Sequence, residues 1–514
     1  MDIDNVLVID LFAGPGGLGE GISSAKTESG QYPFKIGVSV EKDPNAHKTL
    51  TTRALFRKLK YELKDPSNYY RYLHGEITRE QLFELHPEQA TEAEEETLGA
   101  PRELGKDNDL IHSRISQLVS EHSGPKVVIG GPPCQAYSLA GRSRNAGNKE
   151  YVAKEDNRHF LYKEYLEVLS IAQPHVFVME NVKGILSAKI DGEIMFPSIL
   201  EDLKEPGKIT THNCEYSYKI YSLVVPSSDT EAPVYKSTKD YLINCEVHGI
   251  PQARHRVILL GVRSDINAVP AVLEKANAPV TVRQTIDDLP KLRSGFSKQK
   301  DITTDWETCI SENASKVSTI LKSLFNESGI SEQVLQPYKG LKRKKEAPYI
   351  EPVLMPQHLR DWLYDNNLEK VLNHETRGHM ADDLLRYAFC AGYAMAGDGV
   401  SPKSREFPKS LAPAHSNWET GTHADRFRVQ VADKYATTVT SHISKDGHYF
   451  VHYDPKQCRS LTVREAARLQ TFPDNYFFEG NRTSQYVQVG NAVPPLLASY
   501  IGRIIVRVLA QIQT

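Results

Sequence analysis

The sequence contains few cysteines, no CxxC pair and no long apolar run. The six cysteines among 514 residues, at positions 134, 214, 245, 309, 390 and 458, argue against a disulfide framework or a zinc site and predict a reducing compartment. No stretch reaches the ~18 uncharged apolar residues that a membrane helix requires. The acidic start, Met1–Asn5, runs straight into a strand-like segment and does not read as a secretory leader. We therefore expect no metal, no membrane and a cytoplasmic location.

An excess of one charge is also absent. The chain has 62 Lys and Arg against 65 Asp and Glu, a net charge of -3, so its bulk charge does not indicate nucleic-acid binding. A basic groove can still exist within a neutral chain. Hydrophobic residues make up 40%, which excludes global disorder, and the length predicts two structural bodies.

The N-terminal third alternates β-branched runs with helical stretches, which predicts βαβ units around a parallel sheet. We expect strands at 6–10, 35–40, 126–129, 175–179 and 256–262, and an amphipathic helix from 494 to 514 that includes Ile512. Ligands of open sheets bind at the carboxyl ends of the strands. Asp10, Glu41, Cys134 and Glu180 all fall at or just beyond such ends.

The first of these ends is a glycine-rich turn, Asp10 to Gly19, in which backbone can approach a cofactor closely. Glu41, at the end of the next strand, is placed to bind the two hydroxyls of a ribose. The turn lacks both the GxGxxG order of dinucleotide enzymes and the GK[ST] of a P-loop. It therefore favours an adenosyl cofactor without a pyrophosphate.

Two further strand ends carry reactive residues. Cys134 lies in the rigid segment GPPCQAYS, where an exposed thiolate would be a nucleophile. Glu180 ends the apolar run HVFVME, and desolvation there would raise its pKa and let it hold a proton. Arg254 and Arg256 open a later strand, where paired guanidinium groups could bind a carbonyl oxygen, a phosphate or the carboxylate.

These blocks together resemble the cytosine-5 DNA methyltransferase family. DLFAGPGG, GPPCQAYS, ENV, QARHR, RSLTVREAARLQTFPD and QVGNAVPP occur in that family's order and span nearly the whole chain. The resemblance implies an α/β fold, namely a Rossmann-like S-adenosylmethionine-dependent methyltransferase sheet with a second, smaller target-recognition lobe. It implies a catalytic domain at 1–290 plus 476–514, with an insertion near 51–110, and a target-recognition domain at 291–475.

The resemblance also implies roles for individual residues. Cys134 would add to cytosine C6 and Glu180 would manage the proton at N3, while one of Arg254 and Arg256 lies near O2 and the other near Glu180. The base must be flipped out of the duplex to be reached. Residues expected to bind S-adenosylmethionine are Asp10, Phe12, Ala13, Gly14, Gly16, Gly17, Glu41, Pro132, Leu161, Asn491 and Val493, with Asp107 or Asp109 after a third strand as the ligand of the adenine amine.

The expected partner is double-stranded DNA, contacted by Gln135, Ser138, Arg158 and Thr438. A separate cognate restriction endonuclease is a candidate partner, and a monomer is expected because one chain supplies both lobes. The basic run 342–345 is either a solvated loop or a phosphate contact. Arg464 and Arg468 are expected to brace the two lobes.

Other functions compete with this hypothesis. Relatives that methylate tRNA share the blocks but carry a Cys-Phe-Thr signature and a small recognition region, and this chain has neither. A catalytically inactive DNA-binding homologue would be expected to lack the nucleophile or the acid. A cofactor-dependent oxidoreductase would need the phosphate-binding glycine order.

Overall fold

The computed structural model describes residues 3, 5–133, 161–190, 192–229, 232–326, 330–344, 348–413, 418 and 426–512. The chain divides into two compact units. The first comprises Met1–His248, Arg254–Ala276 and Ala492–Thr514, and the second comprises Gly249–Ala253 and Asn277–Asn491. These divisions lie near, but not at, the boundaries of 290/291 and 475/476 expected from the sequence.

A twisted sheet forms the centre of the first unit, with strand order β2-β1-β3-β4-β10-β7 and β8 paired to β10. Its strands are β1 (Val6–Leu11), β2 (Phe34–Val40), β3 (Lys126–Gly130), β4 (Val176–Val182), β7 (Tyr218–Tyr221), β8 (Leu242–Asn244) and β10 (His255–Arg263). The apolar run of β1 is buried along its whole length, as a strand covered on both faces requires. All five predicted strands are present, within a few residues of their expected bounds.

The sheet is mixed rather than parallel. Strands β2, β1, β3 and β4 are mutually parallel, but β10 runs antiparallel to β4 and to β7. The start of β10 therefore lies at the edge where β4 ends, with Arg256 opposite Val182 and Ile258 opposite Glu180. The spacing of apolar residues could not indicate this direction, because a buried strand has the same apolar pattern whether it is parallel or antiparallel to its neighbour.

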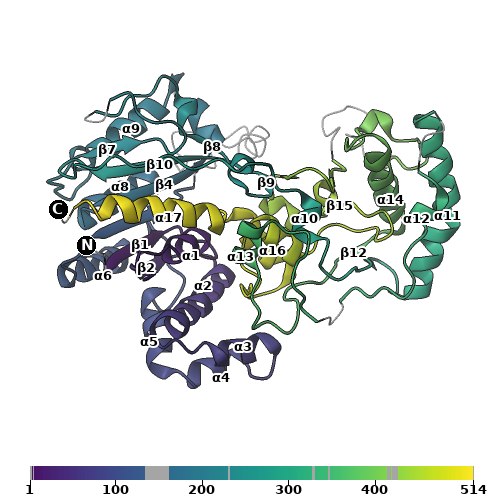
Figure 1. The fold of residues 1–514 in the computed structure, drawn as a ribbon, viewed down its shortest axis with the longest axis horizontal. Coiled ribbons are helices and arrows are strands. Elements are labelled where there is room, and N and C mark those ends of the chain that lie inside the picture. The colour runs from purple at the N-terminus through teal and green to yellow at the C-terminus, as the bar shows by residue number, and fades with distance from the viewer. Residues whose placement is uncertain are drawn as a thin grey trace. The chain divides into compact units, whose positions relative to one another are not determined.

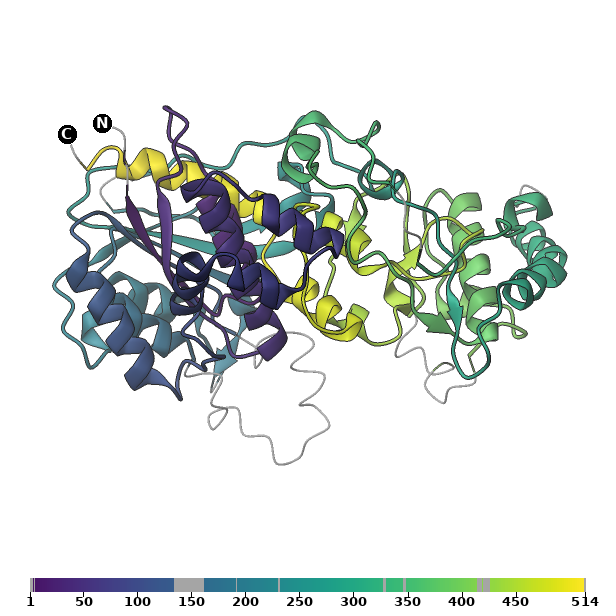
Figure 2. The same cartoon turned by 90° about the horizontal axis from the view of Figure 1, so that it is seen from below.

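Helices cover both faces of this sheet (Figures 1 and 2). Ile9 and Leu11 of β1 enter a core shared with α6 (Asn108–Glu121), α8 (Leu161–Ala172) and α9 (Phe196–Lys204). Asp10, between them, points to the opposite face and lies against α1 (Gly17–Ser23). Helix α17 (Pro495–Leu509) packs on α1. It ends at Leu509, so the prediction that the helix includes Ile512 was wrong.

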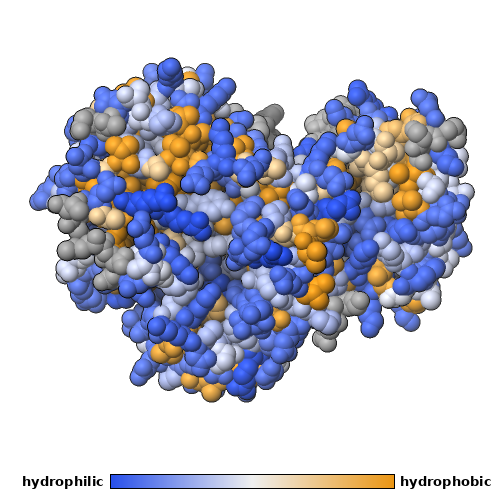
Figure 3. All heavy atoms as spheres, viewed as in Figure 1, coloured by the Kyte–Doolittle hydropathy of each residue, from blue (hydrophilic) through white to orange (hydrophobic). Residues whose placement is uncertain are grey.

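The residues near 51–110 are helical. Helix α2 (Pro44–Arg57) begins before them, and a π-helical turn (Lys58–Glu62), α3 (Ser67–His74), α4 (Arg79–Glu84) and α5 (Pro87–Glu96) follow. We refer to α2–α5 as the helical insertion. Its surface is mostly hydrophilic, and Glu92, Glu94 and Glu95 are exposed (Figure 3). Its inner side is not solvated, because Tyr69 and Leu82 are buried there.

The second unit is built from helices and two-stranded sheets. The helices are α10 (Val282–Ile286), α11 (Thr303–Leu324), α12 (Glu332–Leu335), α13 (Gln357–Leu363), α14 (Ala381–Ala396), α15 (Val463–Leu469) and α16 (Arg482–Asn491). The strands pair as β11 (Gly295–Phe296) with β12 (Gly378–His379), β13 (Val429–Gln430) with β15 (Val451–His452), and β14 (Ala436–Thr437) with β9 (Gln252–Ala253). A core between α11 and α14 includes Leu321, Tyr387 and Phe389.

One helical stretch, Arg482–Leu509, is long and apolar enough by composition to cross a membrane. However, 78% of its most apolar window is buried inside the protein, as in a core helix.

Candidate active site

The backbone of the turn after β1 has a conformation that lets a ligand approach it closely. Phe12, Gly14 and Gly16 adopt φ of 54°, 57° and 94°, a region that favours glycine. Ala13 N donates to Val40 O at 3.0 Å, and this bond ties the turn to β2. A Cβ added to Gly14 would meet no atom of the described residues within 4 Å, so these residues leave the space beside this turn open. Gly17 then begins α1.

Glu41 lies just past the end of β2 and holds this turn. One carboxylate oxygen accepts from Gly14 N at 2.7 Å and the other accepts from Asp43 N at 2.7 Å. Burial raises the pKa of Glu41 despite these bonds. Each oxygen keeps a second lone pair, so the carboxylate can still accept from two hydroxyl groups.

Asp10 is the most unusual residue of the turn. Its side chain is 1% exposed, and in the described part of the chain neither carboxylate oxygen has a hydrogen-bond partner. Burial raises its pKa to about 8, with Glu96 and Glu41 adding to the rise and Arg57 opposing it. A buried carboxylate without partners is costly, and such groups occur where a ligand completes them. The turn, Glu41 and Asp10 together fit a cationic ligand that carries a ribose.

The two candidates for the adenine amine lie on one helix. Asp107 precedes α6, and its Oδ2 accepts from Glu103 N at 2.7 Å. Asp109 is exposed in the first turn of α6. The third strand expected before this acidic residue does not exist, because residues 41–125 contain helices and no strand. The insertion occupies this part of the chain, and β2 forms the edge of the sheet.

An acid and two arginines meet at the carboxyl edge of the same sheet. Arg256 Nε lies 2.6 Å from Glu180 Oε1, and both side chains are largely buried. A Cβ on Gly131, just past β3, would lie 2.7 Å from Glu180 Oε2, so the segment that leads to Cys134 passes directly beside Glu180. Asn181 holds that segment by donating to Pro132 O at 3.1 Å. We assigned Asn181 no role from the sequence, although its place in ENV was the available signal.

Arg254 is 1% exposed and precedes β10. Burial, together with the positive charge of Arg256, lowers the pKa of its guanidinium below the ordinary range. Cys245 N donates to Arg254 O at 3.4 Å. Burial raises the pKa of the Cys245 thiol to about 12, so this second cysteine is protonated and is a poor nucleophile.

Several predicted residues lie elsewhere or outside the described residues. Cys134, Gln135, Ser138 and Arg158 fall within 134–160, which the structure does not describe. Leu161 begins α8 and Pro132 is buried after β3. Asn491 is exposed at the end of α16 in the second unit, whereas Val493 is buried in the first.

Thr438 belongs to a contact within the second unit. Its hydroxyl donates to Ala253 O, and Val439 N donates to Gln252 Oε1 at 3.0 Å. The Gln252 amide also donates to Leu469 O at 2.8 Å. The Thr438-Val439 pair thus holds the backbone immediately before Arg254.

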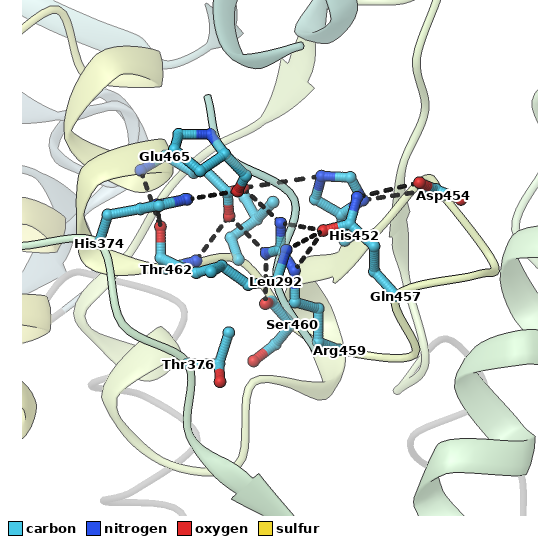
Figure 4. Close-up of polar contacts among 12 residues, drawn as sticks. Leu292, His374, Thr376, His452, Asp454, Gln457, Arg459, Ser460, Thr462 and Glu465 are labelled. Carbon is cyan, nitrogen blue, oxygen red and sulfur yellow. Dashed lines mark hydrogen bonds and ion pairs between the residues drawn. The ribbon is translucent and has the colours of Figure 1, made fainter. Parts of the chain in front are cut away.

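The block RSLTVREAARLQ forms a buried polar network (Figure 4). Arg459 donates to Glu465 through its two terminal nitrogens, Nη1 at 2.7 Å and Nη2 at 2.6 Å, and Thr462 caps α15. In Figure 4, His452 Nε2 lies 3.7 Å from Glu465 Oε1, and His374 Nδ1 lies 2.9 Å from the hydroxyl of Thr462.

Arg464 and Arg468, which were expected to brace the two lobes, have contacts within the second unit, and the bracing role stays a prediction. Arg464 donates to backbone carbonyls of the second unit, and Arg468 binds Asp288 and Asp474 there.

Comparison with known proteins agrees with this arrangement. The model of the C-5 cytosine-specific DNA methylase family matches residues 105–507, and the chain belongs to this family. It is therefore a DNA (cytosine-5-)-methyltransferase with an α/β methyltransferase sheet. The matched range begins after the glycine turn.

The chain is also similar to bacterial methyltransferases over most of its length. The chain is 34% identical to the type II methyltransferase M.Bpa9945I of Bacillus paralicheniformis, over 97% of this chain and 98% of that protein. It is 26% identical to the putative type II methyltransferase M.OihORF3336P of Oceanobacillus iheyensis, over 96% and 94%. It is also 26% identical to M1.HphI of Haemophilus parahaemolyticus, over 79% and 72%.

Proposed function

We propose that this enzyme transfers a methyl group from S-adenosylmethionine to C5 of a cytosine flipped out of a specific double-stranded DNA sequence, through a covalent bond between Cys134 and C6. The observation that carries this proposal is the common sheet edge. The open turn with Asp10 and Glu41, the Glu180–Arg256 pair and the segment leading to Cys134 all lie where β1, β2, β3 and β4 end.

The cofactor would lie along the turn. Asp10 would neutralise its positive charge, Glu41 would accept from the ribose hydroxyls, and Phe12 would pack on the adenine. S-adenosylmethionine supplies an electrophilic methyl group when bound. The other residues proposed for this site are Ala13, Gly14, Gly16, Gly17, Asp107, Asp109, Pro132, Leu161, Asn491 and Val493.

The protein's own groups activate the base. The Cys134 thiolate adds to C6, and Glu180 holds a proton at N3, so electron density moves to C5. C5 then takes up the methyl group, a base removes the C5 proton, and elimination breaks the bond between C6 and Cys134. The 2.6 Å contact supports Arg256 as the arginine that orients Glu180. We therefore propose that Arg254 is the arginine near the cytosine O2.

The second unit would read the DNA sequence, with Thr438 at the end of the recognition region. Gln135, Ser138 and Arg158 would contact DNA beside the flipped base. The enzyme would act as a monomer in the cytoplasm, alongside a separate restriction endonuclease that cuts the unmethylated site.

The Cys134→Ser substitution tests this mechanism. We expect methyl transfer to be lost while the affinity for S-adenosylmethionine stays within about twofold of wild type, because the serine hydroxyl is a far weaker nucleophile than a thiolate. DNA containing 5-fluorocytosine should trap the wild-type enzyme covalently but not the variant. Turnover by the variant would refute the covalent route.

A further inference from the structure

We propose that the helical insertion positions the cofactor turn through two buried arginines, Arg53 and Arg57. This inference rests on the proposed function, because it takes the turn from Asp10 to Gly17 as the S-adenosylmethionine site. It gives the insertion α2–α5 a role in the reaction beyond that of a surface addition.

The contact begins on the helix that carries the turn. Glu20 lies in the first turn of α1, and its N–H donates to Gly16 O at 2.8 Å. Its side chain is 5% exposed, so the carboxylate needs partners. Any shift of Glu20 moves Gly16 and the backbone that lines the open space.

The partners come from the insertion. Arg53 of α2 grips both carboxylate oxygens of Glu20, with Nη2 at 2.6 Å and Nε at 3.0 Å. This two-point contact fixes orientation as well as distance, which a lysine cannot do. Although burial opposes it, the charge of Arg53 lowers the pKa of Glu20 below its usual value, so the carboxylate is ionised.

Arg57 extends the contact to the far end of the insertion. Its Nη1 lies 3.8 Å from Glu20 Oε2, and its Nη2 lies 2.5 Å from Glu96 Oε1 at the end of α5. Arg57 and Glu96 also act on Asp10, in opposite directions. The chain of two arginines and two carboxylates is buried and joins α1, α2 and α5, and Lys58 Nζ lies 3.9 Å from Glu96 Oε2 at its end.

The other sides of α1 leave it little freedom. A Cβ on Gly21 would lie 2.2 Å from Pro495 O and 2.4 Å from Ala498 Cβ, so α17 touches the backbone of α1. A Cβ on Gly19 would lie 2.7 Å from Asp10 Oδ2. Helix α1 is therefore held between α17, the unpartnered aspartate and the arginines. Buried ion pairs add little net stability but impose a defined geometry, which is the property that a binding turn needs.

The Arg53→Lys substitution tests this role, because it keeps the charge and removes the two-point contact. We expect KM for S-adenosylmethionine to rise about tenfold, while kcat and the Kd for DNA stay within about twofold. A merely structural role would lower the active fraction, and so the apparent kcat, with KM unchanged. The matched control is Arg71→Gln on α3, whose pairing with Glu76 is about half-exposed, and it should change none of these quantities.

A KM for Arg53→Lys equal to that of Arg71→Gln would overturn the proposal. If the Arg53→Lys variant does not fold, amide hydrogen exchange of the wild-type enzyme tests the proposal instead. Binding of S-adenosylhomocysteine should slow amide exchange at 53–57 and 93–96 but not at 71–76, and unchanged exchange at the first two segments would overturn the proposal. Failure of the wild type to bind S-adenosylhomocysteine would instead overturn the proposed function.

Discussion

The burial of Asp10 leads to a prediction in which the stability of the cofactor-free enzyme and its affinity for the cofactor change in opposite directions. In the cofactor-free protein burial raises its pKa from 3.8 to about 8, whereas in the unfolded chain the group ionises near its ordinary value. The unfolded state therefore loses this proton first as pH rises. The contribution of Asp10 to stability is complete below pH 3.8 and is lost between 3.8 and about 8.

The size of this loss follows from the same values. A rise from 3.8 to about 8, at about 1.4 kcal/mol for each pH unit, gives an upper bound of about 6 kcal/mol. The Asp10→Asn substitution keeps the shape of the side chain and removes its ionisable carboxyl group. We expect the cofactor-free variant to be more stable than wild type at pH 8 by a few kcal/mol, and the difference to shrink towards pH 5.

The same substitution should impair cofactor binding. A cationic cofactor favours the ionised carboxylate, so its binding to the wild type should release about one proton near pH 6.5, and its affinity should rise up to about tenfold for each pH unit below 8. The amide that Asp10→Asn introduces carries no charge at any of these pH values. The variant should bind S-adenosylmethionine more weakly and with a flat pH profile between 5.5 and 7.

Calorimetry in two buffers of different ionisation enthalpy measures the proton release, and thermal unfolding of the cofactor-free protein from pH 5 to 8 measures the stability. Asp433→Asn, at an exposed carboxylate of the second unit, is the control and should leave both unchanged. A variant with wild-type affinity and the same pH slope would refute the assignment of Asp10 to the cofactor's charge.

Three further predictions concern the rest of the molecule. Glu180→Gln should lower kcat at least about 100-fold with unchanged cofactor affinity, because the amide cannot hold or release the proton at cytosine N3. An unchanged single-turnover rate would exclude this role. Gly490→Ala should lower the free energy of unfolding by about 1–3 kcal/mol in urea titrations, because a Cβ there would lie 2.2 Å from Ser441 N; unchanged stability would contradict the packing. Replacing the exposed Lys342 and Lys344 by Gln should reduce the slope of log Kd for DNA against log salt by about 2 if they contact phosphates, and an unchanged slope would assign them to a solvated loop.

The strands were predictable because their signal is local. Runs such as VLVIDL and HVFVME are buried on both faces of the sheet, so an apolar run of that length bounded by turn residues indicates such a strand. The glycine turn and Glu41 were predictable for the same reason, since each directly follows a strand. The helical character of the insertion also follows from local sequence.

The remaining features depend on contacts between distant segments. The antiparallel direction of β10, which brings Arg256 to Glu180, leaves no trace in the pattern of apolar residues. Glu20 and Arg53 are 33 residues apart in the sequence, and nothing local marks them as partners. Asp288 and Arg468, which form an ion pair in the second unit, are likewise 180 residues apart.

The most direct test of the central claim is methyl transfer from labelled S-adenosylmethionine to unmethylated genomic DNA, followed by bisulfite sequencing, with Cys134→Ser in parallel. The account predicts 5-methylcytosine in one short recurring sequence for the wild type and none for the variant. Labelling of tRNA without labelling of DNA, or equal labelling by the variant, would contradict it.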